Sequence, residues 1–275
     1  MRTIRRYWVG VVAMLVSVIV FIIPFAFILV TAAKSREEAA LLDFTWPSEW
    51  QLGQNIAEVW RARDYMLLTA LINSTILTVA SVATMVVLAA MVGYVLQRRR
   101  GWWTPVANFV ILAGLIIPPA VVPTIWVMQQ FGVYKTLHGL ILVEVAFGLS
   151  FSVLLFRAFV ATIPRELDEA ATMDGAGPVR LFFQVIFPLL RSVIVTVVVV
   201  QAVAVFNDFQ NPLYFLPGDD NATVQLTLFN FQSQFNTMRN LLFTDILLIT
   251  IPPLIMYMFF NRQIVAGLTS GAIKG

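Results

Sequence analysis

The side chains of this chain that could do chemistry are few, and the densest group of them is a run of carboxylates. Residues 163–178 read IPRELDEAATMDGAGP, with acidic side chains at 166, 168, 169 and 174. The chain has no cysteine, a single histidine (His138), and no Gly-x-x-x-x-Gly-Lys-Ser/Thr phosphate loop. We therefore expect no catalytic residues, no metal site and no cofactor on this chain. The acidic run is better suited to contacting a partner.

The pattern within 163–178 predicts a short helix that ends in a sharp bend. Pro164 suits the first helical position, and the following acids lie near the helix N-terminus, where the helix dipole favours anions. Gly175 is placed to end the helix in a left-handed conformation, and Pro178 begins a second helical segment. Spacings of three and four put one set of residues on a common face: Leu167, Ala170, Ala171 and Asp174. An amphipathic helix of this kind fits the groove of a partner. The alternative is a helix packed on its own bundle or on the lipid surface.

Long apolar segments surround this polar run and must position it. The chain of 275 residues is 59% hydrophobic and 12% charged, with a mean hydropathy of +0.84. Runs of roughly 18–25 apolar residues are long enough to cross a bilayer as helices. Six such blocks occur, at about 7–33, 66–96, 105–128, 139–160, 185–207 and 241–260. Because the blocks do not alternate with period two, they predict an all-α membrane protein with six transmembrane helices.

The basic residues predict the orientation of these six spans. Twelve of the 18 Lys and Arg residues fall on the side that holds both termini and residues 163–178. The positive-inside rule places that side in the cytoplasm. We expect one transmembrane domain over 1–275, with a core at about 66–260, a cytoplasmic loop at about 161–184 and a cytoplasmic tail at 261–275.

Several features of the spans suggest a path for a solute. Three prolines at 118, 119 and 123 predict that the third span is broken, as a hinge, as a wall of a path or as a simple packing kink. Glu144, Gln201 and Asn207 are polar residues within or at the ends of spans, where polar groups need water or a partner. Each is a candidate for the path. The alternatives are a hydrated interfacial position for Glu144 and interhelical packing for Gln201.

The outer connection at about 208–240 interleaves polar and aromatic residues. Pro212, Pro217 and Gly218 predict turns there. Its composition suits contact with a carbohydrate or a protein, and a solvated connector is the alternative. The candidate contact residues are Asp208, Phe209, Asn211 and Tyr214.

Residues 163–189 closely resemble the signature loop of ABC importer permeases. The resemblance lies in Glu169-Ala170-Ala171, Asp174-Gly175-Ala176 and Val185 to Pro188, with Ser192 where many members have Pro. The upstream IPRELDE run and the C-terminal VAGLTSGAIKG resemble the carbohydrate branch of that family, in particular its maltose-type second permease. Residues 207–213 also resemble that branch's outer loop, although Phe206 stands where Trp is commoner.

This resemblance implies a type I ABC importer permease fold and a set of partners. The partners would be a second permease in a heterodimer, two ATP-binding cassette subunits that carry ATP and Mg, and a solute-binding protein that delivers a carbohydrate. Glu166, Leu167, Glu169, Ala170, Ala171, Asp174 and Gly175 would couple the chain to an ATPase subunit. The loop at 208–240 would meet the binding protein, and residues 267–275 would lie against the ATPases. The location would be a bacterial cytoplasmic membrane.

Two other classes of protein fit the sequence less well. An ion-coupled secondary carrier of small solutes would need an array of intramembrane carboxylates and repeated halves, and only Glu144 is available. A membrane enzyme would need clustered His, Asp, Glu or Ser at membrane depth, and the sequence shows no such cluster. A nucleic-acid partner would need a basic soluble face, which the sequence also lacks.

Overall fold

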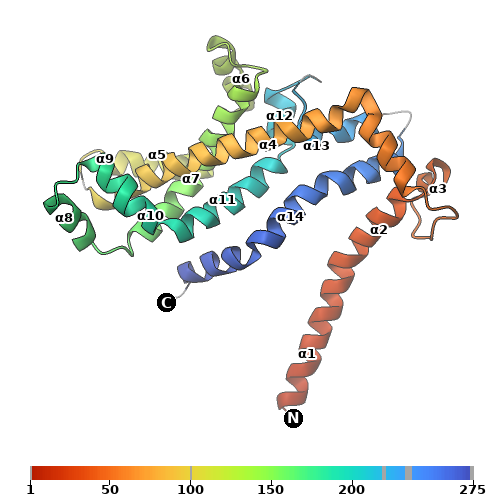
Figure 1. Ribbon diagram of the computed structural model, residues 1–275, viewed down its shortest axis with the longest axis horizontal. Coiled ribbons are helices and arrows are strands. Elements are labelled where there is room, and N and C mark those ends of the chain that lie inside the picture. Colours follow the sequence, from red (N-terminus) through yellow and green to blue (C-terminus); the bar gives the residue numbers. More distant parts are fainter. Residues whose placement is uncertain (1, 100, 219–220, 233–236, 273–275) are drawn as a thin grey trace. The chain divides into compact units, whose positions relative to one another are not determined.

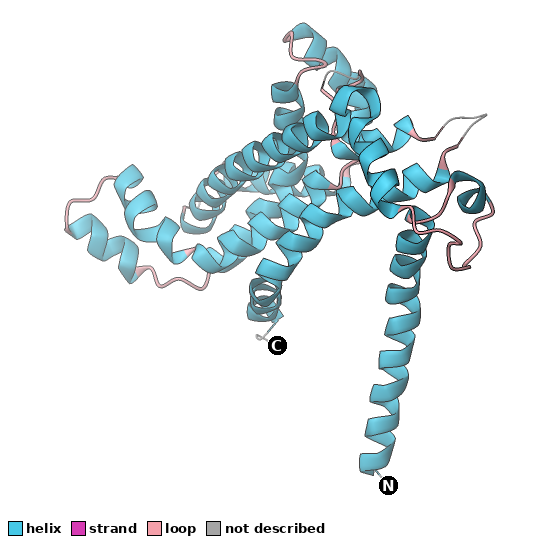
Figure 2. Cartoon of the chain, turned by 45° about the vertical axis from the view of Figure 1, so that its right-hand side comes forward, coloured by secondary structure: helices cyan, strands magenta, loops and turns pink. Residues whose placement is uncertain are grey.

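The computed structural model describes residues 2–99, 101–218, 221–232 and 237–272, with side chains between Gly10 and Phe260. Every regular element in these ranges is helical, which confirms the all-α class (Figures 1 and 2). The elements are α1 Arg2–Ser17, η1 Val18–Ile22, α2 Ile23–Ala32, α3 Arg36–Ala40, α4 Leu52–Arg98, α5 Thr104–Ile116, α6 Val121–Gln130, α7 Leu137–Val160, α8 Glu166–Met173, α9 Pro178–Arg180, η2 Leu181–Ile186, α10 Phe187–Leu189, α11 Arg191–Phe206, α12 Gln210–Phe215, α13 Val224–Thr227, η3 Leu228–Asn230 and α14 Arg239–Ala272.

The described helices include enough long apolar segments for a multi-pass membrane protein. Four of them are long and apolar enough to cross a bilayer: Gly10–Ala32, Leu52–Arg98, Leu137–Val160 and Arg239–Phe260. Two bent pairs raise the number to six if each pair forms one span. All six segments overlap the six apolar blocks of the sequence.

The apolar block at 105–128 is broken at its prolines, as the sequence predicts. Residues 104–116 and 121–130 form two helices at 116° to each other, and Pro118 and Pro119 lie in the non-helical residues between them. Proline has no N–H to donate and disfavours a helical conformation in the residue before it. Accordingly Ile117, the residue before Pro118, is extended at ψ 124°.

The apolar block at 185–207 does not form one continuous straight helix. Residues 178–189 and 191–206 form two helical parts at 77° to each other, so the straight apolar helix begins at Arg191. Pro188 removes a backbone donor just before the bend, and Leu190 leaves the helical region at ψ 3°. Residues 178–189 therefore join the polar segment at 163–178 to α11 through a bend at Leu190, which we call the helical elbow.

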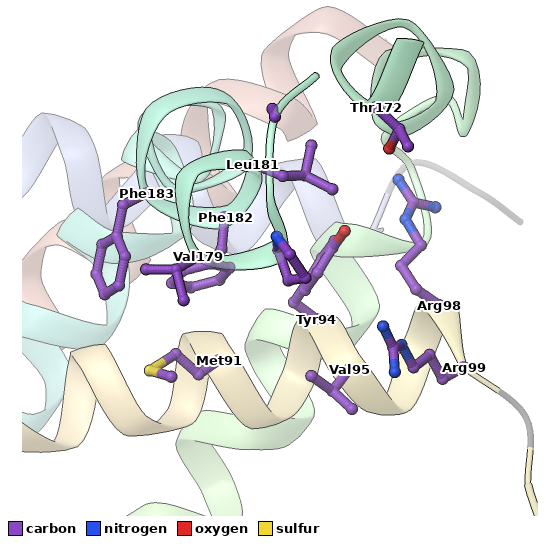
Figure 3. Close-up of a pocket in the computed structure, with 12 residues that line it drawn as sticks. Met91, Tyr94, Val95, Arg98, Arg99, Thr172, Val179, Leu181, Phe182 and Phe183 are labelled. Carbon is purple, nitrogen blue, oxygen red and sulfur yellow. The ribbon is translucent and has the colours of Figure 1, made fainter. Parts of the chain in front are cut away.

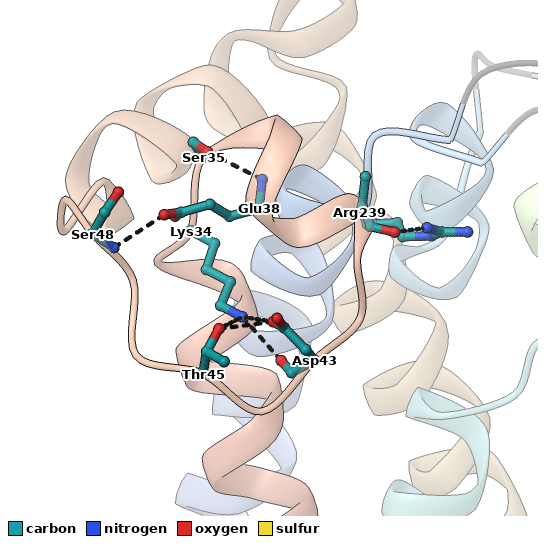
Figure 4. Close-up of polar contacts among 8 residues, drawn as sticks. Lys34, Ser35, Glu38, Asp43, Thr45, Ser48 and Arg239 are labelled. Atoms are coloured by element: carbon teal, nitrogen blue, oxygen red, sulfur yellow. Dashed lines mark hydrogen bonds and ion pairs between the residues drawn. The ribbon is translucent and has the colours of Figure 1, made fainter.

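Contacts divide the chain into two units, and the first comprises residues 1–70 and 224–252. The segment after α2 is held there by the buried Lys34, whose Nζ lies 2.5 Å from Asp43 Oδ1 and 3.1 Å from Thr45 Oγ1 (Figure 4). Ser48 N donates to Glu38 in the same segment, and Arg239 Nη1 donates to Ala40 O. The connection between the first two apolar blocks is thus an organised segment that contains α3 and the start of α4.

The second unit comprises residues 71–223 and 253–275 and holds the larger apolar core. Its core side chains come from α4, α7, η2 and α11, among them Val86, Phe156, Ile186 and Val197. Gly93 lets α4 and α7 approach closely, since a Cβ there would lie 2.9 Å from Phe156 Cβ. This core supports the polar segment at residues 163–178, which is called the polar loop from here on.

Candidate functional site

Helix α8 forms the centre of the polar loop and begins slightly later than the sequence suggests. Its first turn is closed by the N–H groups of Asp168 and Glu169, which donate to Arg165 O at 2.9 and 3.1 Å. The prediction that Pro164 takes the first helical position is wrong, because the helix begins at Glu166. Arg98 Nη2 donates to Ile163 O at 2.9 Å and holds the preceding backbone outside the helix.

Asp168 anchors one face of α8 to the end of α4. Its carboxylate lies 2.9 Å from Arg98 Nη2, and it accepts a 2.5 Å hydrogen bond from Tyr94 Oη. The side chains of Arg98 and Asp168 are only 11% and 16% exposed. Removing one partner of such a shielded pair leaves the other charge uncompensated, which is costly. The position of α8 on its own unit therefore depends on Asp168.

A glycine in the left-handed region ends α8, as the sequence predicts. Gly175 has φ +80°, and its N–H donates to Thr172 O at 3.0 Å. The N–H of Ala176 reaches back to Ala171 O at 3.0 Å. These two bonds form a Schellman motif, which satisfies carbonyls that the helix end would otherwise leave unpaired. Gly175 thus turns the chain from α8 into α9.

The side chains of α8 that point away from the unit form an open acidic face. Among the residues proposed for coupling, Glu166, Leu167, Glu169, Ala170 and Asp174 are exposed, and Ala171 packs against the core. The expected common face of Leu167, Ala170, Ala171 and Asp174 is therefore split, with Ala171 on the packed side. Met173 was not singled out from the sequence, yet it is 88% exposed on this face.

A second polar cluster joins three helices at the same end of the unit. Arg157, in the last turn of α7, donates to Asn108 Oδ1 at 2.5 Å and to Gln97 Oε1 at 3.4 Å. In the sequence, Arg157 and Arg98 are only two of the twelve basic residues that predict the orientation of the spans. Their roles as clamps follow from contacts across more than 40 residues, which no local pattern reveals.

Glu144 lies on α7 and is buried next to the start of α12. Asn211 Nδ2 donates to Glu144 Oε1 at 3.1 Å, and Asp208 interacts with the same carboxyl. The structure thus brings together Glu144 from the proposed path with two of the residues proposed for binding-protein contact. Asn207 caps the end of α11 and bonds Val203 O at 2.9 Å.

Gln201 lies on α11 and faces α7. Its Nε2 donates to Ser152 Oγ at 3.0 Å and to Gly148 O at 3.2 Å. A Cβ on Gly148 would lie 2.4 Å from Met85 Cε, so three helices approach closely here. These contacts favour interhelical packing, rather than contact with a solute, as the role of Gln201.

The connection after α11 is more ordered than the predicted set of turns. Residues 210–215 form α12, so the turn expected at Pro212 is wrong: this proline lies inside a helix and is buried. Asp208 Oδ1 accepts from Gln210 N at 2.8 Å and from Asn211 N at 3.2 Å, which caps the first turn of the helix. Phe215 and Leu216 are buried in a cluster with side chains of α7, whereas Phe209 and Tyr214 remain exposed. Within the described ranges no group of three His, Cys, Asp or Glu residues could hold a metal ion.

Comparison with known proteins settles the family. Residues 85–270 match the family described as binding-protein-dependent transport system inner membrane component. The chain belongs to this family. It contains the permease subunits of ABC transporters, which are not enzymes themselves. The resemblance to carbohydrate-type ABC importer permeases is confirmed.

The relatives of this permease include several named sugar permeases. It is 31% identical to the diacetylchitobiose uptake system permease protein NgcG of Streptomyces coelicolor, over 93% of this chain and 85% of that protein. It is 27% identical to the melibiose/raffinose/stachyose import permease protein MelC of Bacillus subtilis, over 100% of both chains.

The fold of this permease is also found in a solved transporter. A chain in the crystal structure of a bacterial ABC transporter involved in the import of the acidic polysaccharide alginate matches with a TM-score of 0.78. The match covers 95% of this chain and 98% of that one at 20% identity, so it shows a shared fold.

Proposed function

We propose that this permease forms half of the translocation path of an ATP-driven importer for a sugar or sugar-like solute. The relatives named for diacetylchitobiose and for melibiose, raffinose and stachyose support this class of solute. The other half of the path is a second permease subunit. In this arrangement each of the two bent helix pairs forms one span, which gives six spans and places both termini in the cytoplasm of a bacterial cell.

The observation that carries the proposal is the two-sided character of α8. Asp168 fixes one side of the helix to Arg98 and Tyr94, while Glu169 and Met173 are exposed on the other. A short helix that is fixed to its own unit and open on the opposite face can transmit motion from a partner. We assign the open face to a cleft in an ATPase subunit, which carries ATP and Mg.

Transport then follows because ATP binds more tightly to one of the two states of the complex than to the other. ATP binding closes the ATPase subunits and carries α8 with them. The motion reaches the spans through the Asp168 anchor and the helical elbow at Leu190. Because ATP favours one state of the spans over the other, its binding and hydrolysis shift the path between outward and inward access.

The opposite end of the permease receives the solute from a binding protein. One chain in the crystal structure of a bacterial alginate ABC transporter in complex with an alginate pentasaccharide-bound periplasmic protein shares the fold of this chain, with a TM-score of 0.68 at 12% identity. By analogy, we assign Phe209, just before α12, and Tyr214, within α12, to contact with the binding protein, because both side chains are exposed. We assign Glu144 and Asn211, which are hydrogen-bonded to each other, to the start of the path.

The test is ATP-driven sugar uptake by the full complex in liposomes, with Glu169→Lys as the perturbation. Reversing a charge that faces a partner's opposite charge costs several kcal/mol of association, so uptake and the stimulation of ATP hydrolysis should fall at least about tenfold. Glu37→Lys is the control, because Glu37 is exposed on α3 in the other unit. Full coupling in the Glu169→Lys complex would exclude α8 as the ATPase contact.

A further inference from the structure

A cavity of about 410 Å³ lies between the end of α4 and the segment from α8 to η2 (Figure 3). Its volume falls within the range of roughly 300–1,000 Å³ that is usual for sites of small ligands. The cavity belongs wholly to the second unit. It is separate from the outward face of α8 and from the polar cluster around Glu144.

The lining of the cavity is polar at one end and apolar at the other. Figure 3 shows Arg98, Arg99 and Thr172 gathered at one end. The other end is formed by apolar side chains, namely Met91, Val179, Phe182 and Phe183. A ligand that fills this cavity must therefore carry a polar group at one end and hydrocarbon along the rest.

The polar end carries an uncompensated positive charge. Arg98 is paired with Asp168, but its Nε is buried and has no hydrogen-bond partner within the described residues. Arg99 lines the cavity and, in the described part of the chain, has no acidic side chain within ion-pair distance. Two neighbouring guanidinium groups with, among the described residues, a single carboxylate partner between them favour an anion with several oxygens, such as a phosphate.

The surroundings of the cavity indicate that this anion belongs to a membrane lipid. Met91 and Val95 lie in the last two turns of a helix long and apolar enough to span the bilayer, and both are exposed. Trp102, just beyond Arg99, is 90% exposed, and tryptophan is enriched at the membrane–water interface. Basic pockets between helices at the cytoplasmic surface are suited to anionic headgroups.

We propose that this cavity binds one anionic phospholipid of the cytoplasmic leaflet. The phosphate lies beside the guanidinium groups of Arg98 and Arg99, and an acyl chain lies along Met91, Val179 and Phe183. Thr172, which also lines the cavity, belongs to α8, so the lipid contacts both α4 and the helix assigned to ATPase docking. The location in the cytoplasmic leaflet rests on the proposed orientation of the importer.

The experiment measures lipid binding to the purified full-length chain in detergent by native mass spectrometry. The probes are dioleoyl phosphatidylglycerol and dioleoyl phosphatidylcholine, which share acyl chains and differ in headgroup charge. We expect phosphatidylglycerol to bind more tightly. Arg99→Gln should weaken its binding about fivefold, the factor for one basic side chain near a membrane surface. Arg180→Gln is the matched control, since Arg180 is exposed nearby but does not line the cavity.

A second variant tests the apolar end. Val179→Trp should fill the cavity and abolish tight binding of phosphatidylglycerol, and Met91→Trp serves the same purpose if the first variant does not fold. Glycerophosphate, which has the headgroup chemistry without acyl chains, should not compete. Equal affinity for the two lipids, unchanged binding in both tryptophan variants, or full competition by glycerophosphate would each overturn the proposal. Because this measurement needs neither ATP nor a sugar, its outcome is independent of the importer assignment.

Discussion

Gly175 and Gly177 offer a matched pair of substitutions that isolates the turn at the end of α8. Gly175 has φ +80°, whereas Gly177 has φ −68°, and a Cβ on either residue would meet nothing within 4 Å. Changing each to alanine therefore creates no clash. The two variants differ only in whether the backbone conformation suits a residue with a side chain.

The expected difference follows from backbone energetics alone. A residue other than glycine in the left-handed conformation costs about 1–2 kcal/mol. The gain from restricting the unfolded chain, about 0.4–1 kcal/mol for Gly→Ala, is common to both variants and cancels in the comparison. Gly175→Ala should thus open the turn more often than Gly177→Ala, by a factor of about 5–30.

The assay is hydrogen exchange of the amides in the turn, followed by mass spectrometry. Gly175 N–H and Ala176 N–H are the donors of the two closing bonds, so their exchange should be faster in Gly175→Ala. The ratio of sugar uptake to ATP hydrolysis in the reconstituted complex should fall in the same variant. Equal exchange and equal coupling in the two variants would refute the role given to this turn.

Three further predictions address the rest of the chain. Gly93→Leu should lower the free energy of unfolding in detergent by about 1–3 kcal/mol, because the added side chain overpacks against α7. Gly53→Leu is the control and should not lower it, because Gly53 has open space around it. The hydrogen bonds that Asp43 accepts lower its pKa below the ordinary value of 3.8. The ionised Asp43 carboxylate therefore stabilises segment 35–48 fully at pH values above 3.8. This stabilisation is lost as the pH falls through the lowered pKa that Asp43 has in the folded protein. Asp43→Asn should remove this acid transition in hydrogen exchange, and an unchanged transition would contradict the assignment. Glu144→Gln should keep ATP-driven uptake within about fivefold, because an amide oxygen can still accept from Asn211 at a cost of about 1 kcal/mol. Complete loss would instead favour a carrier coupled to protonation of Glu144.

The parts of the fold that depend on local chemistry could be predicted from the sequence. Length and apolar composition located the spans, two prolines located the break after Ile116, and a glycine located the end of α8. Each of these signals acts through the backbone of its own segment. The bend near Leu190 was missed because apolar residues continue on both sides of it.

The parts that depend on distant contacts could not be predicted. Asp168 and Glu169 are adjacent acids in one helical turn, yet one is an anchor and the other is exposed. Only the positions of Tyr94 and Arg98, more than 60 residues away, distinguish them. For the same reason the sequence did not reveal that Ala171 packs inward while Met173 points outward.

Site-directed crosslinking tests the central claim that the outward face of α8 contacts an ATPase subunit. The chain has no cysteine, so Met173→Cys and Ala171→Cys are single-cysteine variants without further changes. Each is labelled with a short photoactivatable maleimide in the assembled complex. The account predicts a crosslink to the ATPase subunit from position 173 and little from position 171. Crosslinks of equal yield from both positions, or none to the ATPase from position 173, would contradict it.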